Sequence, residues 1–154
     1  MAQRALDSTP GKLILLDAFA LIAHVRGEPA ANEVDELLRA ESCGMPAINL
    51  AEVVDNLRRR RGLSAARVAE VLGPLLGEVV EVVPVDERIA WRAADLRAAH
   101  YRRADLELSL ADCVLLSAGG ETDAVATADR AVATVARSEG LDLITLPDSR
   151  GNRP

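Results

Sequence analysis

The chain has 154 residues, of which 49% are hydrophobic and 27% charged, and its net charge at pH 7 is −6. This length and composition predict one globular domain with a hydrophobic core and exclude a disulfide framework, because the chain has only two cysteines. No apolar run approaches the ~20 residues that span a bilayer, and the start does not resemble a secretion signal, so we expect a cytoplasmic protein without a membrane partner.

Short β-like runs alternate with helical patterns along the chain. The expected elements are a strand at 12–16, helices at 18–25 and 29–41, a strand at 45–48, helices at 50–60 and 65–76, a strand at 78–85, helices at 87–101 and 110–118, a strand at 123–127, a helix at 130–138 and a strand at 141–145. The strands are apolar rather than alternating, which is typical of parallel strands buried on both faces. We therefore predict an α/β fold with a parallel sheet of four to five strands sandwiched between helices.

The domain core is expected at about 12–146, with flexible polar tails at 1–11 and 148–154. In the helix at 87–101, Ile89, Leu96 and Trp91 are predicted to face the core. Cys43 and Cys113 have no CxxC partner and are expected to be small core residues.

A single acid, Asp17, interrupts the most apolar stretch of the chain, "LILLDAFALIA" at residues 13–23. A buried carboxylate is costly without a partner, because the ion loses its water. Asp17 follows the first predicted strand, and ligands of open parallel sheets bind outside the carboxyl ends of the strands. Its position therefore indicates a functional site at this edge of the sheet.

Three further acids follow predicted strands or begin predicted helices. Glu52 ends "NLAE", Asp112 ends "SLAD", and Asp129 ends "TAD". Converging carboxylates repel one another, and a bound divalent cation relieves that repulsion. Oxygen ligands with retained waters suit Mg²⁺ or Mn²⁺, so the four acids together predict a metal site.

Helix capping explains the same acids without a site, and both interpretations stay open. Asn49 or Ser109 can cap a helix while Glu52 or Asp112, three residues later, bonds back to it. Asp129 can be a first-turn acid, which the helix dipole favours. Capping does not exclude a site, because a cap also fixes the direction of the side chain.

Four stretches in this order resemble the PIN-domain ribonucleases, in particular the VapC-type toxins of bacterial toxin–antitoxin pairs. They are "LILLDAFALIAHVRGEPAANEVDELL", the residues around "NLAEV", "LSLADCVLLSAG" and "VATADRAV". The resemblance covers nearly the whole chain and implies a parallel sheet between helices. It places Asp17, Glu52, Asp112 and Asp129 at the positions of the family's acidic quartet.

The resemblance implies a metal-dependent endoribonuclease that acts as a toxin and hydrolyses RNA phosphodiester bonds to inhibit translation and growth. Asp17 and Asp112 would contact Mg²⁺, for which Mn²⁺ can substitute, while Glu52 would hold or activate the metal-bound water. Asp129 would complete the shell or position a second ion. The implied partners are an RNA substrate (tRNA, rRNA or mRNA), a small VapB-type antitoxin and a second copy of the chain.

One position departs from the family pattern. The family usually has Ser, Thr or Asn two residues after the first Asp, whereas this chain has Phe19, its only phenylalanine. We interpret Phe19 as a packing residue; the alternative is a catalytically degenerate PIN domain that serves as an RNA- or protein-binding module. Ser109 and Thr127 are first interpreted as helix caps.

Basic residues must hold an RNA strand beside an acidic pocket, because the acids repel phosphates. The candidates are Arg58, Arg59, Arg60 and Arg61, followed by Arg102 and Arg103. The alternative for the run of four is a solvated helix end, where cations suit the dipole. With so few aromatic residues, shape and phosphate contacts are expected to dominate recognition over base stacking.

Other phosphate-handling folds fit the residues less well. A receiver domain needs paired acids after the first strand and a lysine late in the chain, but the only lysine is Lys12. A phosphatase of the haloacid-dehalogenase type needs a second Asp two residues after Asp17, where Phe19 lies. A P-loop is absent from the sequence. The nuclease interpretation is therefore favoured.

Overall fold

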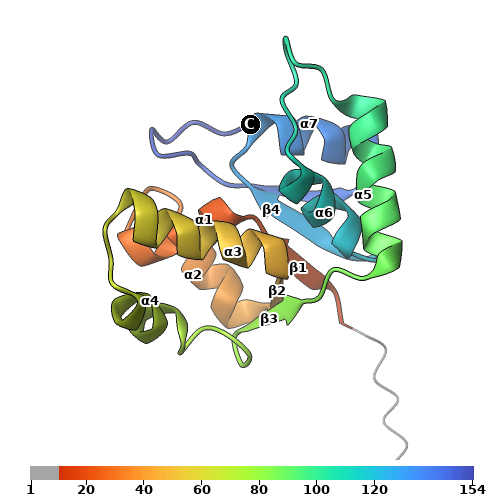
Figure 1. Ribbon diagram of the computed structural model, residues 1–154. Helices are drawn as coiled ribbons and strands as arrows, with labels where there is room; N and C mark the ends of the chain where they lie inside the picture. The colour runs from red at the N-terminus through yellow and green to blue at the C-terminus, as the bar shows by residue number, and fades with distance from the viewer. Residues whose placement is uncertain (1–10) are drawn as a thin grey trace, which may run out of the picture.

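The computed structural model describes residues 11–154, and its centre is a five-stranded sheet with the order β3-β2-β1-β4-β5 (Figure 1). The strands are β1 (Leu13–Leu16), β2 (Ser42–Pro46), β3 (Val80–Val83), β4 (Ala124–Thr127) and β5 (Asp142–Thr145). All neighbours pair in parallel, and Leu15 in the central strand aligns with Gly44 on one side and Val125 on the other. The predicted α/β class with four to five parallel strands is confirmed.

Helices cover both faces of the sheet. They are α1 (Ala18–Arg26), α2 (Ala31–Ala40), α3 (Ala47–Asp55), the short π-helix η1 (Asn56–Arg60), α4 (Ala65–Leu72), α5 (Glu87–His100), α6 (Leu110–Ala118) and α7 (Arg130–Ser138). Within residues 11–154, none of these helices is long and apolar enough to cross a membrane.

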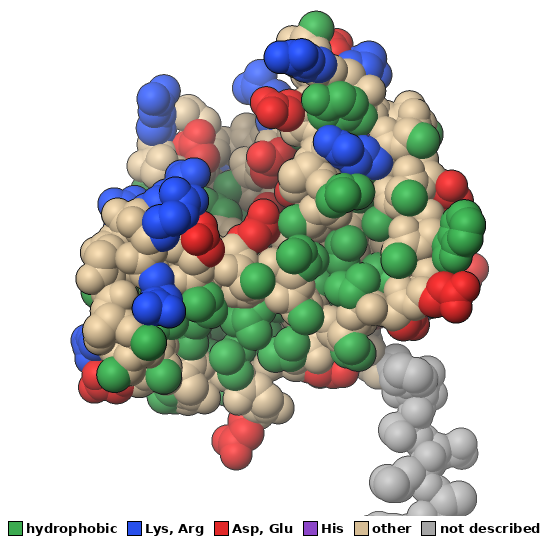
Figure 2. Space-filling model, viewed as in Figure 1, with side chains coloured by type: hydrophobic (Ala, Val, Ile, Leu, Met, Phe, Trp, Pro, Cys, Tyr) green, Lys and Arg blue, Asp and Glu red, His purple; other side chains and the backbone are tan. Residues whose placement is uncertain are grey.

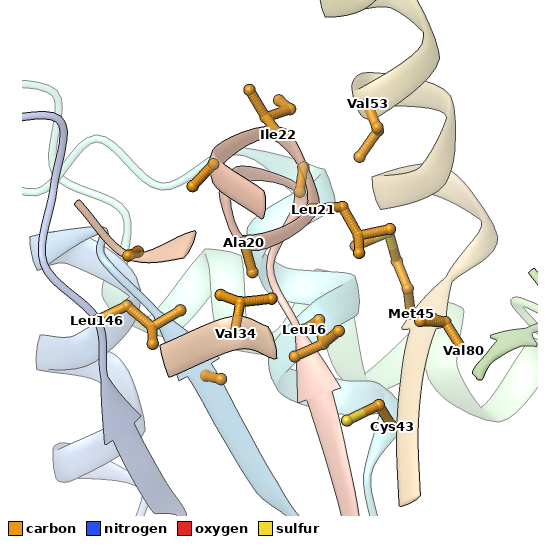
Figure 3. Close-up of a cluster of buried hydrophobic side chains, with 14 of the residues drawn as sticks. Leu16, Ala20, Leu21, Ile22, Val34, Cys43, Met45, Val53, Val80 and Leu146 are labelled. Carbon is orange, nitrogen blue, oxygen red and sulfur yellow. The ribbon is translucent and has the colours of Figure 1, made fainter. Parts of the chain in front are cut away.

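Successive residues of β1 point to opposite faces of the sheet, as the strand geometry requires. Ile14 and Leu16 belong to a buried cluster that includes residues of α1 to α4, whereas Leu15 belongs to a second cluster with residues of α5 to α7. Figure 3 shows the first cluster, in which Leu16 of β1 lies near Val34 of α2. This packing on both faces explains why the strands are apolar throughout.

The second strand lies earlier in the chain than predicted. β2 ends at Pro46, which is extended at φ −60° and ψ 145°, and α3 begins at Ala47 rather than at residue 50. The expected strand at 45–48 was wrong because a short apolar run does not distinguish a strand from a buried helix start. Asn49 therefore lies inside the first turn of α3, and the predicted Asn49 cap does not form.

Two other predictions need correction. α4 ends at Leu72 rather than at residue 76, because Pro74 lacks the N–H that would continue the helix. Trp91 is 68% exposed, although Ile89 and Leu96 are buried as predicted. The buried face of α5 follows the spacing of Ile89, Ala93 and Leu96, and a residue two positions after Ile89 points away from that face.

The C-terminal segment is tied to the domain by hydrogen bonds. The predicted tail at 1–11 lies, except for Gly11, outside the described residues. In the C-terminal segment, the Asp148 side chain accepts backbone hydrogen bonds from Arg150 and Asn152 at 2.8 and 2.9 Å. Arg153 contacts Glu33 of α2 and the carbonyl of Thr145. These bonds form a turn, which we call the C-terminal turn (148–152); its flexibility stays a prediction.

Candidate active site

A cavity of about 810 Å³ opens at the carboxyl ends of the central strands. It is lined by all four predicted acids, Asp17, Glu52, Asp112 and Asp129. Figure 2 shows acidic side chains gathered in a hollow, with basic side chains beside and above it. The fold therefore brings together acids that the sequence places on four separate elements.

Asp17 is the buried member of the quartet. It is only 7% exposed, and its backbone N–H donates to the carbonyl of Ala126 in the neighbouring strand at 3.1 Å. The Thr127 hydroxyl donates to Oδ2 of Asp17 at 2.6 Å. Burial raises the pKa of Asp17 to about 7, and the charges of Asp112 and Asp129 add to the rise, which the Thr127 hydrogen bond opposes. Asp17 thus stores electrostatic strain that a cation would relieve.

Thr127 is the residue that links two of the acids. Its hydroxyl donates to Asp17 and accepts the backbone N–H of Asp129 at 2.9 Å. The predicted role of Thr127 as a helix cap is wrong, because it lies in β4 and the cap of α7 is Asp129, which accepts the N–H of Val132 at 3.0 Å. The sequence did indicate this role, because in "TAD" the threonine ends a buried strand two residues before an acid.

Asp112 is fixed by the capping box that the sequence predicts. Its N–H donates to the Ser109 hydroxyl at 3.0 Å, and its Oδ2 accepts the Ser109 N–H at 2.8 Å. Burial raises the pKa of Asp112, and the charge of Asp129 adds to this rise. The caps of Asp112 and Asp129 each use one carboxylate oxygen, so a second oxygen of each is left for a ligand.

Glu52 lies across the cavity on α3 and is held more loosely. The Asn49 amide donates to its Oε2 at 3.4 Å, and Asn49 itself is fully buried. Burial raises the pKa of Glu52, with a further contribution from Asp112. Asn49 was predicted as a cap; its observed contact makes it a positioning residue for the Glu52 carboxylate.

Only two of the six predicted RNA-binding arginines line the cavity, and these are Arg59 and Arg60 of η1. Arg59 makes two hydrogen bonds from its Nε and one from its Nη2 to Asp55, at 3.0 to 3.2 Å, and this pairing lowers the pKa of Asp55. Arg58 lies in an adjoining groove instead. Arg61, Arg102 and Arg103 are not among the cavity residues, and the last two lie in the segment that projects between α5 and α6 (Figure 1).

The remaining walls were not expected from the sequence. Phe19, Ile22 and Ile48 form an apolar part of the lining, whereas Asp148 and Ser149 bring the C-terminal turn to the cavity. The C-terminal turn meets α1 and α3 only in the folded chain, so no local sequence pattern predicts that it lines the cavity.

The donor set fits a divalent cation with oxygen ligands. Among the described residues, no group of three His, Cys, Asp or Glu side chains is arranged to hold one metal ion together. Mg²⁺ needs less than this, because it keeps several waters and takes one or two carboxylates. Asp17 and Asp112 line the same cavity, and the charge of Asp112 adds to the raised pKa of Asp17, so these two are the candidate ligands.

Comparisons with known proteins agree with this fold. A sequence model of the PIN domain family matches residues 14–150, whereas no curated protein sequence matches the chain. VapBC2 from Rickettsia felis, solved bound to a promoter DNA fragment, has a TM-score of 0.61 and 16% identity over 86% of this chain and 97% of that one.

Two further solved structures share the fold. FitAcB from Neisseria gonorrhoeae has a TM-score of 0.57 and 24% identity, over 85% of this chain and 96% of its own. VapC20 from Mycobacterium tuberculosis, a toxin that cleaves the sarcin–ricin loop, has a TM-score of 0.52 and 19% identity over 83% of this chain and 84% of its own. At these identities the likeness shows the fold.

Proposed function

The chain belongs to the PIN domain family, and from that premise we propose that it is a metal-dependent endoribonuclease, the toxin of a toxin–antitoxin pair. One observation carries the proposal: Asp17, Glu52, Asp112 and Asp129 line a single cavity, and burial raises the pKa of Asp17 to about 7. A cavity that only bound RNA would gain nothing from acids that repel phosphates. A site that holds a cation would need them.

The proposed chemistry is hydrolysis of an RNA phosphodiester, in which water attacks phosphorus and the bond to the leaving ribose oxygen breaks. Asp17 and Asp112 would hold Mg²⁺ or Mn²⁺, and Asp129, in the same cavity, would hold a water of the ion's shell. When bound, the cation supplies charge neutralisation at the phosphate and lowers the pKa of water. Glu52 is our candidate general base, because its raised pKa brings it nearer to the pH at which it must accept a proton.

The other residues of the cavity would position these groups. Thr127 holds Asp17 in place through its 2.6 Å hydrogen bond, and Asn49 does the same for Glu52. Arg59 and Arg60 would bind phosphates on either side of the cleaved bond, as cations at the rim of an acidic pocket.

We propose a small VapB-type antitoxin as the protein partner. Support comes from the solved complexes of similar fold, which include a toxin–antitoxin complex from Klebsiella pneumoniae. The chain offers an apolar groove beside η1, lined by Val54, Ala65, Ala69 and Leu76 among others, where a hydrophobic antitoxin segment would fit. A cytoplasmic location, where substrate RNA and antitoxin are made, is part of the same proposal.

A homodimer is also proposed. Leu110 is 58% exposed and Val85 41% exposed, and Figure 2 shows apolar side chains gathered below the acidic hollow. Burial of such side chains in a second copy would remove them from water. Sedimentation of the purified chain tests this, and a monomer at micromolar concentration would contradict it.

The deciding experiment incubates purified chain, free of antitoxin, with total cellular RNA and Mn²⁺. We expect cleavage that disappears with a chelator and in Asp17→Asn or Asp112→Asn, because each variant removes one ligand charge. Calorimetry should show the matching loss of Mn²⁺ affinity. Asp142→Asn is the matched control, since Asp142 pairs with Lys12 at the surface and does not line the cavity.

The second candidate function is a degenerate PIN domain that binds RNA or protein without cutting. Phe19 favours it, because a benzyl group lines the cavity beside Asp17. Wild-type protein that leaves all RNA intact with Mn²⁺, together with cutting restored by Phe19→Ser, would replace the nuclease proposal with this one.

A further inference from the structure

The cavity has two chemically different walls. Beside the acids, part of its lining is apolar, formed by Phe19, Ile22, Ile48 and neighbouring alanines. Phe19 packs partly against the buried cluster of α1 to α4, and the rest of its ring remains accessible. Ile48, in the first turn of α3, is 42% exposed. An accessible aromatic ring therefore lies in the same cavity as Asp17, two residues away in the chain.

This arrangement is costly unless a ligand uses it. Apolar surface at the cavity mouth remains in contact with water, which is unfavourable. The chain's other large aromatic residues, Trp91 and Tyr101, are not part of this lining. The one phenylalanine in the sequence is thus located beside the proposed metal site.

An RNA strand presents the matching chemistry. A phosphate held among the acids and the cation has a base attached within one nucleotide on either side. Each of the four bases, when unpaired, has an apolar face that can stack on an aromatic ring. A cavity of about 810 Å³ has room for a phosphate together with an adjacent nucleoside.

We propose that Phe19, backed by Ile22 and Ile48, stacks one unpaired base next to the phosphate that is cleaved. This inference rests on the proposed ribonuclease function and deepens it, because it makes unpaired RNA the substrate class. A base held in a duplex cannot turn its face to the ring. The sequence predicted that shape and phosphate contacts dominate over base stacking. At Phe19 we instead expect one base to stack.

The test uses a short single-stranded RNA that the protein cuts at one bond and a set of copies with one abasic nucleotide each. For the wild type, we expect abasic substitution at one position beside the cut to weaken binding by about tenfold, the usual size of one base–aromatic stack. Binding is measured by fluorescence anisotropy with Mn²⁺ on copies whose cleaved bond is replaced by a non-hydrolysable linkage, and kcat/KM is measured with Mn²⁺ on the cleavable RNA.

The variants separate stacking from packing. Phe19→Leu keeps an apolar side chain without the ring, so it should lose about tenfold on intact RNA and nothing further on the abasic copy. Phe19→Tyr keeps the ring and should behave as the wild type. Trp91→Leu is the matched control, because it removes an exposed aromatic outside the cavity and should change neither measurement.

Two outcomes would overturn the inference in distinguishable ways. Equal losses for Phe19→Leu on the intact and abasic RNA would show that Phe19 only packs, and the nuclease proposal would stand. Absence of binding and cleavage for every RNA by folded wild-type protein would remove the nuclease proposal and this inference together. Thermal melts of each variant show whether it folds. If Phe19→Leu does not fold, the abasic series on the wild type still decides, because equal binding of every abasic copy and of the intact RNA would overturn the inference.

Discussion

The two sides of the cavity differ in how firmly they hold their charged groups. On the side of β4, α6 and α7, backbone N–H groups and two hydroxyls fix Asp112, Asp129 and Asp17 at 2.6 to 3.0 Å. On the side of α3 and η1, Glu52 has one 3.4 Å contact with a side-chain amide, and Arg59 is paired with Asp55 at the surface. One side is therefore built into the backbone, whereas the other rests on side chains.

This difference matches the two tasks that the proposed function requires. Metal ligands must be held in place before the ion arrives, because a loosely placed carboxylate loses affinity. Groups that meet a flexible RNA strand must adjust to it, and a surface ion pair such as Arg59–Asp55 exchanges at little cost, since its contribution to stability is small. The π-helix η1, a form frequent at functional sites, lies on the adjustable side.

The largest expected effect comes from titrating Asp17, on the side of β4, α6 and α7, which we call the fixed side. The pKa of Asp17 is raised from 3.8 to about 7, so the folded protein retains a proton that the unfolded chain has lost. Asp17 therefore contributes stability below pH 4 that is lost as the pH rises to about 7. We expect the metal-free protein to lose on the order of 2–4 kcal/mol across this range through Asp17.

Urea unfolding with a chelator at pH 5 and pH 8 measures this loss. Asp17→Asn should flatten the dependence and stabilise the metal-free protein at pH 8, and Mn²⁺ should stabilise only the wild type. If the free energy of unfolding falls equally for Asp17→Asn and the wild type between pH 5 and pH 8, ionisation of Asp17 does not cause the loss.

A smaller effect is expected from the hydroxyl that joins Asp17 to Asp129. Thr127→Val keeps the shape of the side chain but removes both of its hydrogen bonds, so Mn²⁺ affinity should fall by about 10–100-fold, the usual effect of losing an outer partner of a ligand. Calorimetry measures it. Thr134→Val is the control, because the Thr134 hydroxyl bonds to the Arg130 carbonyl on the exposed face of α7. Unchanged affinity in Thr127→Val would mean that Asp17 does not depend on this contact.

The smallest effect should come from the adjustable side. Replacement of Arg59 and Arg60 by Ala should lower RNA affinity by about tenfold and reduce the salt slope by about 1.4, since each phosphate contact on a single strand contributes about 0.7. Arg102→Ala with Arg103→Ala is the matched pair outside the cavity and should retain the wild-type slope. Identical slopes for both pairs would assign Arg59 and Arg60 to a solvated helix end.

The sequence was most informative where the position of a residue in its strand or helix determines at which edge of the sheet its side chain lies. Asp17, Asp112 and Asp129 follow strands or begin helices, and parallel strands bring those points to one edge, so their meeting could be predicted. Glu52 was expected in a first helical turn but lies in the second turn of α3. Asn49 was misplaced because Pro46 and Ala47 fit a strand end and a helix start equally well. Thr127 and the C-terminal turn depend on contacts between residues far apart in the chain, which no local pattern records.

Because β1 lies in the centre of the sheet, the cavity can form only late in the synthesis of the chain. A ribosome adds Asp17 long before the strand beside it, which is made of residues 124–127. The carbonyl of Ala126 and the hydroxyl of Thr127, both of which bond Asp17, are synthesised more than a hundred residues later. Whatever the pocket does, an unfinished chain cannot do it, because translation must pass residue 127 before the first acid has its neighbours.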